Sequence, residues 1–337
     1  MRIHFDVTAH GFGHLAMTSA VVRALLEQHP DHQISLGIDY SKEVLLEFLN
    51  PHELSKITII KGPFDPAIPM DGPLQVDIPK TKSIYQEAIE HAPSILTAER
   101  ERLRPISPDI LVSNVSPWSL AAVADWQVKR IAFSSLDWAN QLKFMGLEAE
   151  ASFVRTLYQH ADMFVGATPH ADLDDMPNAI TIGPMGRLGQ NKRDILDQEL
   201  GMPHLALLTF GGLDGISPQY SVALDGSLEN WGFVTPDMAK QLGLSHVDCV
   251  ASVDVLITKP GYGTYVEALL HQKPCLTWPR ESWLEATNTN AFMQAHDALV
   301  IRDEAQSLKD QLERTEALNV QSINNSGAIE LLRHFNL

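Results

Sequence analysis

The first third of the chain alternates short apolar runs with longer segments of helical periodicity. Residues 3–8 are β-prone and end at a glycine-bearing turn at 10–14, after which residues 17–28 carry apolar side chains at helical spacing. The same order recurs, and the further expected elements are a strand at 33–38, a helix at 42–49, a strand at 109–113, a helix at 120–126 and strands at 130–134 and 163–165. Strands that alternate with helices predict a parallel sheet covered on both faces, in which ligands gather beyond the carboxyl ends of the strands.

A second α/β unit follows a segment rich in glycine and proline. Residues 182–190 show no periodicity, which is typical of a linker, and we place a domain boundary near residue 185. Beyond it the pattern predicts strands at 204–210, 253–258 and 275–278, a helix at 265–271, a helix-capable tail at 307–325 and a short amphipathic helix at 328–335. The expected domains are residues 1–184, residues 185–320 and a carboxyl-terminal helix within 321–337 that needs a surface to cover, for which the first domain is a candidate.

The composition fits a folded protein of two domains and excludes several classes of function. The chain has 337 residues, of which 45% are hydrophobic, and roughly 150 residues per domain give two domains. The formal net charge of −17 repels polyphosphate backbones, so we expect no nucleic-acid partner. The two cysteines, Cys249 and Cys275, form no CxxC pair and predict neither a disulfide framework nor a structural zinc site.

Targeting signals are not visible in the sequence. Its apolar runs are far shorter than the roughly 20 residues that span a bilayer, and the first residues lack the pattern of a signal peptide. We therefore expect a cytoplasmic protein without a transmembrane segment, while peripheral membrane contact stays open.

Three glycine-bearing loops carry the main chemical signal. Residues 10–14, 211–212 and 260–264 each follow an expected strand, and the first and last of them precede a helix. Backbone N–H groups at such positions can face a phosphate, with the positive end of a helix dipole behind them. Each loop taken alone can also be a tight turn without a ligand. Ala16 replaces the third glycine of a dinucleotide fingerprint, which leaves a dinucleotide-dependent oxidoreductase as one alternative.

One motif in the second half carries a family resemblance. Residues 258–269, Thr-Lys-Pro-Gly-Tyr-Gly-Thr-Tyr-Val-Glu-Ala-Leu, with Pro274 and residues 279–285 after them, resemble the donor-binding region of GT-B glycosyltransferases. They are similar to the branch of the peptidoglycan-lipid N-acetylglucosaminyltransferase and to the glycosyltransferase-like amino-terminal domain of arabinokinases. Further motifs of these relatives are matched, in the expected order, at residues 11–14, 113–117 and 134–138.

The resemblance implies both an architecture and an activity. The fold would be α/β, with two Rossmann-like domains facing across a cleft, the GT-B arrangement. The activity would be transfer of a hexosyl or N-acetylhexosaminyl group from a nucleotide-diphosphate sugar to a hydroxyl acceptor, with inversion at the anomeric carbon. The nucleotide sugar would be a co-substrate held by the second domain, and neither a metal nor another cofactor is implied.

The loops of the matched motifs supply the expected donor site. Backbone N–H groups of four glycines would bind the diphosphate, namely Gly211, Gly212, Gly261 and Gly263. The Thr264 hydroxyl, the helix start near Tyr265 and the neighbouring Tyr262 would add to this site. Glu267, one turn further on, would accept hydrogen bonds from both ribose hydroxyls, and the alternative is an ordinary exposed first-turn acid favoured by the helix dipole.

Charged residues around these loops complete the expected donor site. Lys259 and Arg280 are candidate counter-charges for phosphate, with surface salt bridges as the alternative. Arg187, in the linker, can reach either a phosphate or a neighbouring carboxylate. Glu281 and Glu285 can contact sugar hydroxyls or form a solvated acidic helix face.

An inverting transfer also needs a base that takes the proton of the acceptor hydroxyl. His14, in the first loop, is the expected base, since histidine suits this role near neutral pH. Asp137 is a second candidate, either as base or as the group that orients the histidine. The expected acceptor side also includes Gly11, Gly13, Asn114 and Ser135. Asn114 stands where the related motif usually has aspartate, and an amide can only donate or accept hydrogen bonds.

Two alternatives on the same scaffold stay open. A nucleotide-sugar epimerase would bind the donor and act without an acceptor, and a non-catalytic protein would bind it without turnover. The paired glutamines of the peptidoglycan branch are replaced by Ala286 and Thr287, so the N-acetylglucosamine specificity of that branch is not carried over to this chain.

Overall fold

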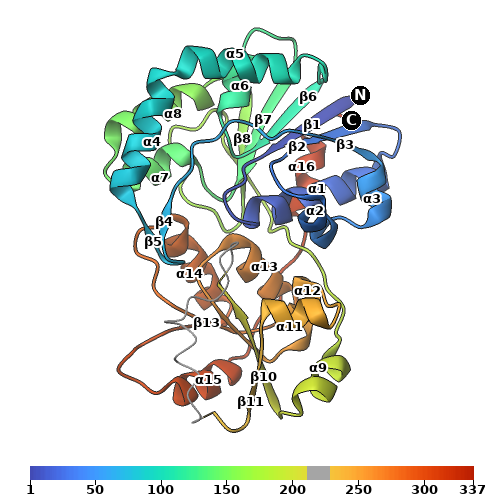
Figure 1. Ribbon diagram of the computed structural model, residues 1–337, viewed down its shortest axis with the longest axis vertical. Coiled ribbons are helices and arrows are strands. Elements are labelled where there is room, and N and C mark those ends of the chain that lie inside the picture. Colours follow the sequence, from blue (N-terminus) through green and yellow to red (C-terminus); the bar gives the residue numbers. More distant parts are fainter. Residues whose placement is uncertain (211–227) are drawn as a thin grey trace.

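The computed structural model describes residues 1–210 and 228–337, and within them two parallel sheets organise the chain into two lobes (Figure 1). The first sheet has seven strands in the order β3-β2-β1-β6-β7-β8-β9. They are β1 (Arg2–Val7), β2 (Gln33–Gly37), β3 (Ile57–Ile60), β6 (Ile110–Asn114), β7 (Lys129–Ser134), β8 (Met163–Ala167) and β9 (Ile180–Ile182). We call the part of the chain built on this sheet the first lobe.

Helices cover both faces of the first sheet because its central strands are apolar on both sides. Along β6, Ile110 and Val112 belong to one apolar cluster and Leu111 to another, which is the alternation expected of a strand. The helices of this lobe are α1 (Gly13–Gln28), α2 (Lys42–Phe48), α3 (Pro51–Ser55), α4 (Ile78–Glu90), α5 (Ala92–Leu103), α6 (Trp118–Ala122), α7 (Trp138–Phe144) and α8 (Glu148–Tyr158). A small antiparallel pair, β4 (Met70–Asp71) and β5 (Gln75–Val76), extends toward the second lobe (Figure 1).

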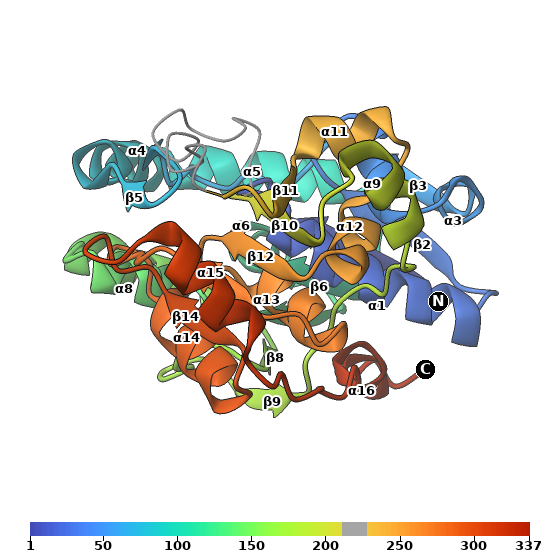
Figure 2. The same cartoon turned by 90° about the horizontal axis from the view of Figure 1, so that it is seen from below.

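The second lobe is built on five parallel strands in the order β11-β10-β12-β13-β14. They are β10 (His204–Thr209), β11 (Trp231–Val234), β12 (Val255–Thr258), β13 (Cys275–Thr277) and β14 (Leu299–Ile301). Its helices are α9 (Arg193–Leu200), α11 (Pro236–Gln241), α12 (His246–Ser252), α13 (Tyr262–Leu270), α14 (Glu285–Ala295) and α15 (Leu308–Glu316). Helix α15 lies against β12, β13 and β14 (Figure 2).

The last helix, α16 (Gly327–Arg333), returns to the first lobe. It contacts α1 and β9, and its Leu331 and Leu332 are buried in the apolar cluster that includes β1. The chain crosses to the second lobe between the end of β9 and the start of α9, a stretch that includes the expected boundary near residue 185.

The predicted α/β class with parallel sheets is confirmed, while several element boundaries differ from the prediction. Helices α1 and α13 begin four and three residues earlier than predicted, at Gly13 and Tyr262, because glycine and tyrosine near a loop do not show apolar periodicity. The helix predicted at 120–126 spans only Trp118–Ala122, and of the helix-capable tail only Leu308–Glu316 is helical.

The lobes touch through the first turns of two helices. A Cβ atom built on Gly263 of α13 would lie 3.7 Å from Cα of Gly13 and 3.8 Å from Cβ of Ala16, both in α1. Tyr262 and Val266 of α13 are buried in the apolar cluster of the first lobe. The loop that precedes α1 and the loop that precedes α13 therefore meet at the junction of the lobes.

Candidate active site

The candidate site lies where the carboxyl ends of strands from both lobes meet. Residues 8–12 follow β1 and lead into α1, and residues 259–261 follow β12 and lead into α13. A Cβ atom on Gly11, Gly13 or Gly261 would have no described atom within 4 Å, so space adjoins both loops. Parallel α/β sheets bind ligands at this edge.

Neither α1 nor α13 has a side-chain cap at its N-cap residue. Phe12 at the N-cap of α1 and Gly261 at the N-cap of α13 make no side-chain cap hydrogen bond, and the first turns of both helices contain no acid. Unsatisfied N–H groups and the helix dipole together favour an anion at each start.

His14 is held in one orientation by Asn114. The Asn114 amide nitrogen donates to the His14 carbonyl and to the Thr18 hydroxyl, both at 3.2 Å, so its oxygen faces the His14 ring. That oxygen lies 2.8 Å from Nδ1 of His14. Because an amide oxygen only accepts, Nδ1 carries the proton and Nε2 keeps its lone pair. Burial lowers the pKa of His14 to about 4, with the hydrogen bond to Asn114 opposing this shift, so the ring is neutral at neutral pH.

Aromatic side chains from both lobes surround the loop before α1. The ring of His10 stacks on Trp283 of the second lobe, with centroids 5.2 Å apart and an interplanar angle of 13°. Trp138 of the first lobe presents an edge contact to His10 at 5.6 Å and to His14 at 5.8 Å. Neither tryptophan is among the predicted site residues.

Positive charge gathers at the same place. Burial lowers the pKa of His10 to about 3, and nearby His14, Arg280 and Lys259 lower it further. Arg280 is only 8% exposed, and its guanidinium lies 4.1 Å from the centroid of the Trp283 ring. Its pKa is lowered to about 10 by burial, against the attraction of Glu285, so the guanidinium is still cationic at neutral pH.

Arg280 has few partners for a buried cation. Within residues 1–210 and 228–337 its Nε is buried without a hydrogen-bond partner. Nη1 lies 3.5 Å from the Pro260 carbonyl oxygen and Nη2 lies 3.9 Å from the Met70 sulfur, both long contacts. A buried cation of this kind favours an anionic ligand.

Of the two predicted glutamates, Glu281 is exposed and Glu285 is buried. Glu285 makes a hydrogen bond between the two lobes. The Ser135 hydroxyl, at the end of β7, donates to the Glu285 carboxylate across the junction. Burial raises the pKa of Glu285, and contacts with Ser135, Arg280, Trp283 and the backbone N–H of Tyr262 lower it in part. An internal carboxylate thus already lies at the first turn of α13.

Glu267 and Arg187 form a buried ion pair. Nε and Nη2 of Arg187 lie 2.6 and 3.1 Å from the two carboxylate oxygens of Glu267, which is 1% exposed. Of the two contacts considered for Arg187, the structure shows the one with a neighbouring carboxylate. The ribose contact of Glu267 stays a prediction, since both of its oxygens accept from Arg187.

Asp137 caps a helix. Its carboxylate accepts hydrogen bonds from the backbone N–H and the side-chain amide of Asn140, each at 2.8 Å, at the start of α7. Burial raises the pKa of Asp137 to about 6, and the contacts with Asn140 and Arg155 oppose this shift. These contacts account for the aspartate structurally, and its catalytic role stays a prediction.

The remaining predicted residues are placed as follows. Tyr262 is buried, and its hydroxyl accepts from the backbone N–H of Met185 at 3.0 Å. Thr264 and Lys259 are half-buried near the start of α13. Gly211 and Gly212 lie outside the described residues.

Asp65 is a further buried acid that sequence reasoning missed. One of its oxygens accepts from Nε1 of Trp138 at 3.0 Å and from the Thr8 hydroxyl, while the other has no partner among the described residues. Burial raises the pKa of Asp65 to about 7. The sequence signal that could have found it is the β-prone run at 57–60, Ile-Thr-Ile-Ile. A strand predicted there would have placed Asp65 in the loop that follows its carboxyl end.

Comparisons with known proteins agree with this architecture. No protein-family model matches the chain. L-arabinokinase of Arabidopsis thaliana is 23% identical over 322 residues, and the match covers 89% of this chain and 30% of that protein. The chain thus spans less than a third of the length of this curated relative.

Solved structures match nearly the whole chain. The calicheamicin glycosyltransferase CalG4 superposes with a TM-score of 0.60 at 15% identity, covering 99% of this chain and 93% of its own. The spinosyn forosaminyltransferase SpnP gives 0.59 at 12% identity, covering 100% and 95%. Medicago truncatula UGT71G1, solved with UDP-glucose, gives 0.59 at 14% identity, covering 98% and 93%.

One physical finding bears on membranes: among the described residues, no helix has the length and apolarity required to cross a bilayer. The two parallel sheets, the meeting of their loops and the structural likenesses lead to one conclusion about architecture. The chain has the GT-B fold found in nucleotide-sugar glycosyltransferases.

Proposed function

We propose that this chain transfers a glycosyl group from a nucleoside-diphosphate sugar to a hydroxyl acceptor at the junction of its lobes. The observation that carries the proposal is the buried Arg280, a cation with few partners, beside the first turns of α1 and α13. Neither N-cap residue makes a side-chain hydrogen bond, and the Tyr262 N–H of α13 already has a carboxylate partner, Glu285. A diphosphate supplies the negative charge that such a site favours.

Arg280 and the helix starts would act mainly on the leaving group. As the bond to the sugar breaks, negative charge grows on the diphosphate, and fixed donors stabilise that charge more than the ground state. Lys259 and His10, which lie near Arg280, add donors at the same place. The likeness to UGT71G1, which was solved with UDP-glucose, supports a nucleotide sugar as the ligand of this fold.

His14 would act on the acceptor. Its Nε2 lone pair is free of the contact with Asn114, and its low pKa keeps the ring neutral and able to take a proton. A base on the first lobe and a leaving group on the second suit attack from the face opposite the diphosphate. We therefore propose inversion at the anomeric carbon, with a hexosyl or N-acetylhexosaminyl donor.

A second candidate function is binding of the nucleotide sugar without transfer. Asn114 favours it, because an amide cannot neutralise the imidazolium that forms when His14 takes a proton. Burial of His14 opposes that protonation further.

The test compares binding and turnover in wild type and His14→Ala. We expect the variant to bind nucleoside diphosphates with near wild-type affinity, measured by calorimetry, and to lose turnover by on the order of 10²-fold or more. Turnover is the release of nucleoside diphosphate from a panel of nucleotide sugars with added acceptors. His52→Ala, at an exposed site on α3, is the matched control.

Each result separates the alternatives. Unchanged turnover in His14→Ala would remove this residue from the mechanism. Binding without turnover in wild type supports the second candidate, and an isomerised donor would support an epimerase.

A further inference from the structure

A second cluster of chemically active side chains lies at the opposite edge of the second sheet. His204 is the first residue of β10, Asp254 directly precedes β12, and Glu316 is the last residue of α15. Each offers one ligand atom, and these atoms all lie within 4.8 Å of one another. In the part of the chain that the structure describes, this is the one such group of three His, Cys, Asp or Glu side chains.

The fold holds the Asp254 carboxylate by one oxygen. Oδ2 accepts from the backbone N–H of Leu205 and from Nη1 of Arg193, each at 2.7 Å. Oδ1 has no hydrogen-bond partner among the described residues, so it is available to a ligand. A carboxylate fixed through one oxygen is the arrangement in which an outer partner orients a metal ligand.

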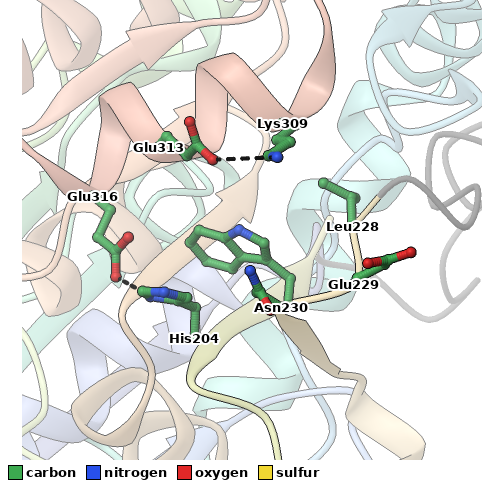
Figure 3. Close-up of a pocket in the computed structure, with 8 residues that line it drawn as sticks. His204, Leu228, Glu229, Asn230, Lys309, Glu313 and Glu316 are labelled. Carbon is green, nitrogen blue, oxygen red and sulfur yellow. Dashed lines mark hydrogen bonds and ion pairs between the residues drawn. The ribbon is translucent and has the colours of Figure 1, made fainter.

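His204 is oriented by its neighbours as well. Its ring packs on Trp231 of β11, with centroids 5.2 Å apart, and its Nδ1 lies 2.6 Å from Oε1 of Glu316. Figure 3 shows the His204 and Glu316 side chains pointing toward one another from β10 and α15.

An open cavity of about 100 Å³ adjoins this pair. His204 and Glu316 line it, together with the charged residues Glu229, Lys309 and Glu313 (Figure 3). Three glutamates against one lysine give the lining a negative balance, which attracts cations. The cavity also gives water access to the ligand atoms.

We propose that His204, Asp254 and Glu316 bind a divalent transition-metal cation such as Zn²⁺, with water from the cavity completing its coordination. One imidazole nitrogen and two carboxylate oxygens form a donor set that zinc accepts, whereas Mg²⁺ prefers oxygen ligands alone.

The distances require only small side-chain movements. Ligand atoms in a tetrahedral zinc site are roughly 3.3 Å apart, given bonds of about 2.0 to 2.1 Å. The pair at 2.6 Å must open slightly and the wider separations, up to 4.8 Å, must close. The metal replaces the hydrogen bond between His204 and Glu316, with Nδ1 of the neutral ring as the ligand and its proton carried on Nε2.

The site is independent of the proposed transfer reaction. It lies at the amino ends of β10 and β12, whereas the candidate active site follows their carboxyl ends. A bound metal would join two strands and α15, and so stabilise the second lobe. No pattern in the sequence indicates this site, because the ligands are about 50 to 60 residues apart and follow no short metal-binding motif.

Zinc titration of the metal-free protein tests the proposal. We expect wild type to bind one more Zn²⁺ than His204→Ala or Glu316→Gln in calorimetry. If a variant still binds zinc at this site, its affinity should be lower than that of wild type by at least roughly 10- to 100-fold. That is the loss seen when a residue that only orients a metal ligand is removed. Glu313→Gln, which alters the same cavity outside the cluster, is the matched control and should bind as wild type does.

Thermal unfolding gives a second readout. Zn²⁺ should raise the melting temperature of wild type and of Glu313→Gln, and leave those of His204→Ala and Glu316→Gln unchanged. MgCl₂ should leave all four unchanged. Equal zinc binding by wild type and both cluster variants, or no zinc binding by wild type, would overturn the proposal. Circular dichroism confirms that the variants fold, and two different substitutions guard against one that does not.

Discussion

Asn114 determines what His14 can do as a base. It fixes the proton on Nδ1 and leaves Nε2 free, but it brings no negative charge to the ring. Burial therefore dominates, and the pKa of His14 falls to about 4. A neutral ring is available at neutral pH, and the same burial makes it a weak base.

We predict that Asn114→Asp strengthens this base. A carboxylate beside Nδ1 favours the imidazolium, so the pKa of His14 should rise. The fall of kcat/KM on the acid side, expected near pH 4 in wild type, should move to higher pH, and turnover at neutral pH should increase. The measurement is the pH dependence of kcat/KM.

Asn114→Ala is the control for the charge. It removes the hydrogen bond without adding a carboxylate, so turnover should fall. The pH at which kcat/KM falls on the acid side should not move upward. An acid limb at the same pH in wild type and Asn114→Asp would show that His14 is not the titrating base.

Sequence reasoning identified His14 and Asn114 but missed some of the residues packed around them. The resemblance matched their loops, which fixes their place at the ends of strands. Trp283 and Asp65 are brought to the site by packing between segments far apart in the chain, and such contacts leave no local pattern.

At the scale of elements, the segment that connects the lobes, around residues 186–187, packs against α13. Cβ of Gly186 would be 3.0 Å from Val266 and from Leu270, so a larger residue here would require these two side chains to shift by a few tenths of an ångström. Arg187 follows at once and forms its ion pair with Glu267. The connection is thus attached to the helix that begins at the candidate donor site.

We predict that Glu267→Gln mainly destabilises the fold. The change leaves the buried guanidinium of Arg187 without its counter-charge, a loss that typically costs about 3–5 kcal/mol. Urea unfolding at neutral pH measures it. Glu101→Gln, in the exposed pair with Arg104, is the control and should change little. Unchanged stability together with weaker nucleotide binding would instead support the ribose role of Glu267.

The pattern of apolar residues predicted most central strands but not the exact helix starts. Strands such as β6 and β10 are buried on both faces and appear as continuous apolar runs. The starts of α1 and α13 are set by backbone geometry at glycines and by contact between the lobes, which apolar periodicity does not report.

At the scale of the whole molecule, the second lobe inserts residues into the first. Trp283 and Ala286 are buried in an apolar cluster of the first lobe. The Gln141 side chain donates to the Ser282 carbonyl at 3.1 Å and accepts from the Leu284 N–H at 2.9 Å. The arrangement of two lobes was predicted from the resemblance, whereas these contacts depend on tertiary packing.

The central claim is that this junction binds the diphosphate of a nucleotide sugar. Calorimetric titration of wild type and Arg280→Met with a panel of nucleoside diphosphates tests it most directly, and Arg314→Met, at an exposed site on α15, is the control. We predict that at least one nucleoside diphosphate binds wild type and the control equally, and binds Arg280→Met roughly 10- to 100-fold more weakly, as the loss of a charged hydrogen bond implies. Equal affinity for wild type and Arg280→Met, or no binding of any nucleoside diphosphate to folded wild type, would contradict the account.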